Sequence, residues 1–171
     1  ASSRSQIIQS QEGGVLEELL VKEGDIVEEG ALLARIEPTR AESAFFEVQG
    51  KSASLQATVA RLNAEVYGGA LKFPEALAQY PEFERNQRAL FEKRQRAVQQ
   101  EIGAIETMKH LAQQELQMNK PLVDSGDVSR SEVLRLMRQV ADLDAQITNK
   151  RNRYFQDAQA ELGKAQEDLA A

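Results

Sequence analysis

The spacing of the hydrophobic residues changes near residue 39, which divides the chain into two regions. Before that point, short apolar pieces such as Val15–Val21 and Leu32–Ile36 alternate with glycine-containing turns, as is typical of short β-strands. After it, apolar residues recur three and four positions apart, which is the period of helices that pack along one face. The pattern predicts a β region over residues 1–38 and an α-helical region over residues 39–171.

Three helices are expected within the α-helical region, because glycine, proline and turn-forming residues interrupt it twice. The connector between the first two helices contains two prolines and is expected to form at most one short helical turn. We expect helix 1 at about 40–67, a connector over 68–82, helix 2 at about 83–123, a tip loop over 124–129 and helix 3 at about 130–170.

Two capping boxes support these helix starts. Thr39 with Glu42, and Ser129 with Glu132, each place a hydroxyl three residues before a glutamate, so that side chains satisfy amides at the first turn. Gly126 suits a left-handed position close to the end of helix 2. The sequence therefore predicts a tight turn, rather than a long loop, between helices 2 and 3.

Helices 2 and 3 are nearly equal in length, at roughly 40 residues or about 60 Å each. Equal helices joined by a short loop predict an antiparallel hairpin whose far end is the tip loop. In helix 3, the three-four alternation holds as far as Tyr154 and resumes at Ala158 after an extra spacing of four, which is a stutter that relaxes the supercoil locally. The expected fold class is mainly α, a long coiled-coil hairpin with one additional helix.

Composition limits the chemistry that this chain can perform. The net charge is -6, which argues against a nucleic-acid surface, and there is no cysteine for a disulfide or a thiolate site. No apolar run reaches the roughly 20 residues that a membrane-spanning helix needs. The single histidine, His110, is expected at the surface, and we predict no catalytic site, cofactor or metal.

The tip loop and the end of helix 2 contain the candidate binding residues. A hairpin of this length with no catalytic constellation suggests that its tip contacts a partner, with Leu122 as an apolar contact and Ser129 as a polar one. The structural alternative is that Leu122 and Val123 only close the end of the hairpin.

The β region resembles the first half of a biotinyl or lipoyl domain through "GGVLEELLVKEGDIVEEGALLARIE". In the carrier enzymes of that family, a lysine in the next turn carries the cofactor. The matching position here is Arg40, which cannot form that amide, and the helix start predicted at Thr39 replaces the turn. A biotin- or lipoate-carrier domain is therefore the weaker alternative.

A half-lipoyl segment that opens directly into a helical hairpin resembles the periplasmic adaptors, or membrane fusion proteins. Within them, "LVDSGDVSRSEVLRLMRQ" is similar to the HlyD-type adaptors of type I secretion. The tip pattern of the broader family has an arginine, a leucine four residues later and a serine seven further on. Leu122 and Ser129 match it, whereas Met118 stands at the arginine position and implies an apolar contact there. The candidate tip site is thus Met118, Leu122, Val123, Gly126 and Ser129.

This resemblance implies a non-catalytic adaptor in the periplasm, whose parent protein is anchored in the inner membrane of a Gram-negative bacterium. It would join an inner-membrane ABC transporter to a TolC-type outer-membrane channel, assemble into a ring, expected to be hexameric, and serve a secreted polypeptide. The family chain returns from the hairpin into a second lipoyl half, so we expect this chain to be a fragment. An adaptor of a drug-efflux pump is the alternative within the family.

Overall fold

The computed structural model describes residues 6–11, 13–37 and 40–171, and these residues form two compact units. The first unit covers Ala1–Lys51 and the second Ser52–Ala171. Helix α1 (Arg40–Tyr67) begins in the first unit and ends in the second. The capping box expected at Thr39 lies outside the described residues. The mainly α fold class that the sequence predicts is confirmed, with long helices and a small two-stranded sheet.

The first unit contains an antiparallel pair of short strands, β1 (Val15–Leu19) and β2 (Ala34–Glu37). Leu16 pairs with Ile36, and the register shifts by one residue between Leu16 and Glu18, as at a β-bulge. The backbone at Gly14 passes so close to β2 that an added Cβ would lie 2.8 Å from the Glu37 carbonyl oxygen. A side chain does not fit there, which explains the glycine.

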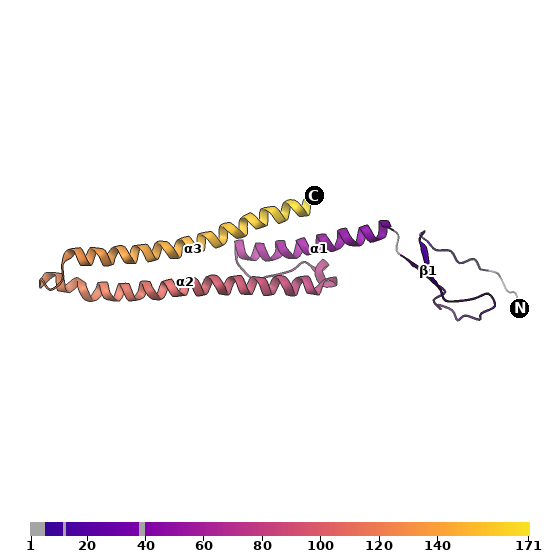
Figure 1. Ribbon diagram of the computed structural model, residues 1–171, viewed down its shortest axis with the longest axis horizontal. Helices are drawn as coiled ribbons and strands as arrows, with labels where there is room; N and C mark the ends of the chain where they lie inside the picture. The colour runs from indigo at the N-terminus through magenta and orange to yellow at the C-terminus, as the bar shows by residue number, and fades with distance from the viewer. Residues whose placement is uncertain (1–5, 12, 38–39) are drawn as a thin grey trace. The chain divides into compact units, whose positions relative to one another are not determined.

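The second unit is built on α2 (Pro81–Asp124) and α3 (Arg130–Ala170), which run antiparallel and are joined at the tip loop (Figure 1). The connector contains one short helix, η1 (Glu75–Gln79), with Leu77 fully buried. Helix α2 starts at Pro81, a residue that is well suited to the first turn because it lacks an amide hydrogen. The helix continues through Pro121 for one more turn instead of breaking there.

The seam between α2 and α3 follows the predicted three-four spacing. The buried residues of α3 in this seam are Val133, Leu136, Leu143 and Ile147. On α2, Ala112 is buried. Two polar positions near this seam are occupied by ion pairs between the helices: Lys109 Nζ lies 2.6 Å from Asp144 Oδ1, and Lys150 Nζ lies 2.8 Å from Glu101 Oε2. Lys150 is exposed at the edge of the seam and pairs across the hairpin.

The stutter predicted in α3 coincides with a change of packing partner. Before it, α3 buries its apolar residues against α2, whereas beyond it Ala158, Leu162 and Ala165 form a core cluster with Leu62 of α1. The additional spacing of four residues shifts the apolar face of α3 relative to the seam with α2. Hence the residues Ser52–Tyr67 of α1 pack against the hairpin at the end opposite the tip loop (Figure 1).

Candidate functional site at the hairpin tip

The tip site lies at the turn between α2 and α3, and backbone hydrogen bonds fix its shape. The carbonyl oxygen of Leu122 accepts hydrogen bonds from the amides of Asp127, at 3.1 Å, and Val128, at 3.2 Å. The Ser125 hydroxyl also donates to that oxygen at 3.1 Å. Gly126 has a φ of 80°, the left-handed conformation that allows the chain to reverse so tightly. The tip loop is therefore a closed, well-satisfied turn.

Ser129 begins α3 as its N-cap residue. Its hydroxyl accepts a hydrogen bond from the Glu132 amide at 3.2 Å, which is the first half of the expected capping box. The Glu132 carboxylate is bound by Arg135, with a shortest distance of 2.6 Å. Hydrogen bonding to the Arg135 guanidinium lowers the pKa of Glu132 below its usual value, so the carboxylate stays ionised next to the helix start.

The apolar members of the tip site differ in exposure. Met118 is 66% exposed and Leu122 is 40% exposed, and their spacing of four residues places both on one side of α2. Val123 is half-buried. Leu122 and Met118 thus present apolar surface to solvent, whereas Val123 is less accessible.

One apolar feature was missed at the sequence level. Met118 and Leu122 continue a stripe of exposed apolar residues along α2 that begins at Met108 and includes Leu111. We call these four residues the α2 stripe. A second set, Leu134 and Met137 of α3, is exposed in the same way and is called the α3 stripe. The residues of the α2 stripe are three, seven and four positions apart, which is a helical spacing and could have revealed the stripe. The more regular apolar pattern of the seam on the same helix drew attention away from it.

A charged cluster at the other end of the second unit was also missed. Arg61 and Glu65 of α1, Arg94 of α2 and Glu161 of α3 lie together, and we call these four residues the ionic clasp. Arg61 and Glu65 are almost completely buried. Sequence periodicity cannot find such a cluster, because arginine and glutamate are counted as exposed positions.

The described residues lack the cluster of side chains that a metal ion requires. No group of three or more histidine, cysteine, aspartate or glutamate residues among them is placed to hold a metal ion. His110 is exposed on α2. Over the same residues, no helix has the length and apolar character needed to cross a membrane.

Comparison with known proteins finds a relative among bacterial secretion proteins, in agreement with the resemblance seen in the sequence. The chain is 27% identical to the alkaline protease secretion protein AprE of Pseudomonas aeruginosa, over an alignment that covers 99% of this chain and 45% of AprE. The chain thus spans less than half the length of that relative. No protein-family model matches it.

One solved structure is also similar, the soluble domain of LipC, a membrane fusion protein of a type I secretion system. The match covers 98% of this chain and 73% of that one, at 21% identity and a TM-score of 0.36. A TM-score of this size does not establish a common arrangement of the whole chain.

The N-cap at Ser129 allows its structural and binding roles to be separated. We expect Ser129→Ala to lower the free energy of unfolding by about 1 kcal/mol, because it removes the oxygen that accepts from the Glu132 amide. Ser129→Asp keeps an N-cap acceptor and should leave stability nearly unchanged, while it alters the surface of the tip. Urea unfolding followed by circular dichroism measures both variants. Equal stability losses would show that the cap does not stabilise α3.

Proposed function

We propose that this chain is the hairpin region of a non-catalytic periplasmic adaptor that links an inner-membrane ABC transporter to a TolC-type outer-membrane channel for protein secretion. The observation that carries the proposal is the exposed apolar side of a rigid turn, formed by Met118 and Leu122 at the end of a long hairpin. The similarity to a protease secretion protein supports a polypeptide as cargo rather than a small drug.

The contact with the channel is proposed to be end to end, through the five residues of the tip site. Burial of one leucine side chain contributes roughly 1.5–3 kcal/mol, so that a single tip binds weakly. Several tips presented together gain effective concentration and bind far more tightly. The test is retention of a TolC-type channel by this chain immobilised densely on beads, compared with sparse immobilisation. Absence of retention at both densities would refute the proposal.

Assembly of the adaptor into a ring is proposed to use the α2 and α3 stripes. At about 100° per residue, each stripe lies to one side of its own seam. Because α2 and α3 run antiparallel, the two stripes then lie on opposite flanks of the hairpin. A contact between unlike flanks of neighbouring copies is heterologous, and such contacts close into rings when the rotation permits. A hexameric ring remains the expectation.

This arrangement predicts the effect of a charge within the α3 stripe. Met137→Asp should weaken self-association of the chain about tenfold or more, because an apolar side chain that is 46% exposed would be replaced by a charged one within the contact. Sedimentation velocity over a range of protein concentrations measures this. Leu90→Asp, on α2 and outside both stripes, is the control. Unchanged association of the Met137 variant would exclude the α3 stripe from the contact.

The structure weighs against the cofactor-carrier alternative. A carrier lysine must project from a turn, whereas Arg40 is the first residue of α1. An intact mass of the chain that includes biotin or lipoate would nevertheless restore that alternative.

A further inference from the structure

The C-terminal part of α1, Ser52–Tyr67, is bound to the hairpin in a different way from the α2–α3 seam. Three of its buried apolar residues are alanines, Ala53, Ala57 and Ala64, and Leu62 is its one fully buried large side chain. Small side chains remove little apolar surface from water, so that this contact gains less than a seam of leucine and isoleucine. Ala53 and Ala57 pack against Leu77 of η1, and Leu62 packs against Leu162 of α3, so the polar contacts of α1 add to a modest apolar contact.

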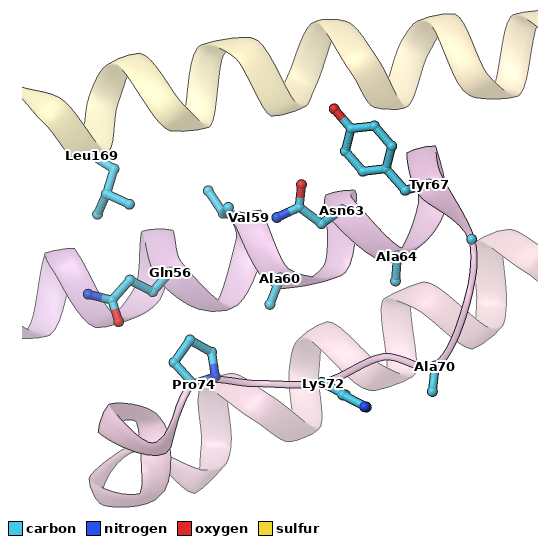
Figure 2. Close-up of a pocket in the computed structure, with 11 residues that line it drawn as sticks. Gln56, Val59, Ala60, Asn63, Ala64, Tyr67, Ala70, Lys72, Pro74 and Leu169 are labelled. Atoms are coloured by element: carbon cyan, nitrogen blue, oxygen red, sulfur yellow. The ribbon is translucent and has the colours of Figure 1, made fainter.

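Grooves that are open to solvent adjoin this part of α1. One, of about 440 Å³, lies between α1, the connector and the end of α3, with Val59 and Asn63 on the side of α3 and Ala60 on the side of the connector (Figure 2). A second, of about 290 Å³, lies where α1 ends, and Glu65 and Phe91 are among its lining residues. Along both grooves α1 faces solvent instead of protein side chains, so these positions add little to its packing.

The ionic clasp joins α1 to both helices of the hairpin. Arg61 Nη1 lies 2.8 Å from Glu65 Oε1, and Arg61 Nη2 lies 3.5 Å from Glu161 Oε2. Arg94 donates to both oxygens of Glu161, at 3.1 and 3.2 Å, and its Nε lies 3.5 Å from Glu65 Oε1. Arg61 also donates to Gln87 Oε1 at 2.7 Å. The two arginines thus share two carboxylates, which balances the charge across three helices.

Desolvation offsets part of the attraction within the ionic clasp. Taking ion pairs out of water costs free energy that opposes their attraction. Both arginines approach Oε1 of Glu65, whereas its Oε2 is buried and accepts no hydrogen bond from any described residue. A buried acceptor left in this state destabilises the closed arrangement. Burial lowers the pKa of Arg94, but the hydrogen bond to Glu161 and the two nearby carboxylates outweigh it and raise the pKa overall.

We propose that Ser52–Tyr67 of α1 is a separately opening element, which the ionic clasp holds against an α2–α3 hairpin that stays closed when α1 leaves. Gly68 and Gly69, with φ values of 74° and 93°, follow α1 directly and give the chain a turn at which it can open. Local opening of the least stable element is a general property of proteins. The hairpin then has two states, with and without a third helix at its base.

Hydrogen exchange of the full 171-residue chain tests this proposal. Most of the stability of a helix in a protein comes from tertiary packing, so the amides of 52–67 lose protection when α1 leaves the hairpin. In the unmodified chain, we expect the amides of 52–67 to exchange at least about tenfold faster than those of 133–147 in the seam. Equal rates in the two segments would overturn the proposal, because they would show that the second unit opens only as a whole.

A pair of charge-removing variants tests the role of the clasp. Glu161→Gln should speed exchange of 52–67 by about threefold to tenfold and leave 133–147 unchanged, because Glu161 is half exposed and binds both arginines. Asp144→Asn removes the exposed pair with Lys109 within the hairpin and is the matched control, which should leave 52–67 unaffected. An unchanged exchange rate of 52–67 in the Glu161 variant, or equal acceleration by both variants, would refute the proposal that the ionic clasp holds α1 in place.

Discussion

Replacing Leu122 by aspartate is expected to reduce retention of a TolC-type channel by the immobilised chain at least about tenfold, without unfolding the hairpin. The leucine is 40% exposed at the tip, so that its apolar surface is available to a partner. Loss of a buried leucine removes roughly 1.5–3 kcal/mol per contact, and each 1.4 kcal/mol is a factor of ten in affinity. Multivalent presentation multiplies the loss over several tips.

The control for this experiment is Leu90→Asp. Leu90 lies on the same helix, is 38% exposed and is far along α2 from the tip loop, so the same substitution is made in a similar environment. Both variants should keep the helical circular dichroism and nearly the same melting temperature. If Leu122→Asp retains the channel as well as Leu90→Asp does, the tip is not the docking surface.

The second large effect is expected in stability. Leu136→Ala should lower the free energy of unfolding by about 2–5 kcal/mol, because Leu136 is fully buried in the α2–α3 seam and the truncated side chain leaves a cavity. Leu134→Ala, two residues away and 49% exposed, should cost less than about 1 kcal/mol. Guanidinium titration monitored at the helix signal measures both. Similar losses in the two variants would contradict the assigned seam.

The hairpin could be predicted from the sequence because its information is local and periodic. Apolar residues three and four apart define one face, and glycine and proline mark its interruptions. Leu136 and Ile147 follow the three-four alternation of α3, and both are buried in the seam. The stutter after Tyr154 was visible too, although its reason, the change of partner from α2 to α1, needed the structure.

The packing of α1 could not be predicted in the same way. Its heptad pattern emphasises Leu55, Val59 and Val66, yet these are only half-buried, and the buried positions include Ala53, Ala57 and Arg61. Alanine occurs on both buried and exposed faces of helices, so it does not identify the buried face. A buried arginine is the opposite of what a hydrophobic pattern predicts. Its burial depends on Glu65, Gln87 and Glu161, of which two lie on other helices and far away in the sequence.

The tip site contains residues that the local sequence predicts and residues whose role depends on another molecule. Gly126 and Ser129 have strong local signatures, and the structure gives them the turn and the N-cap that those signatures indicate. Whether Met118, Leu122 and Val123 bind a partner is a property of another molecule's surface, which a single sequence does not encode. The role of the five residues in docking therefore stays a prediction.

Because the α2–α3 seam and the ionic clasp lie in different parts of the hairpin, the hairpin can change in length without a change at the clasp. Seven residues added to α2 and seven to α3, between the tip loop and the stutter, would preserve the phase of every apolar contact. Each such paired insertion would move the tip outward by about 10 Å while leaving α1 and its attachment untouched. Descendants of one ancestor could in this way match compartments of different width in discrete steps, without redesigning either end of the molecule.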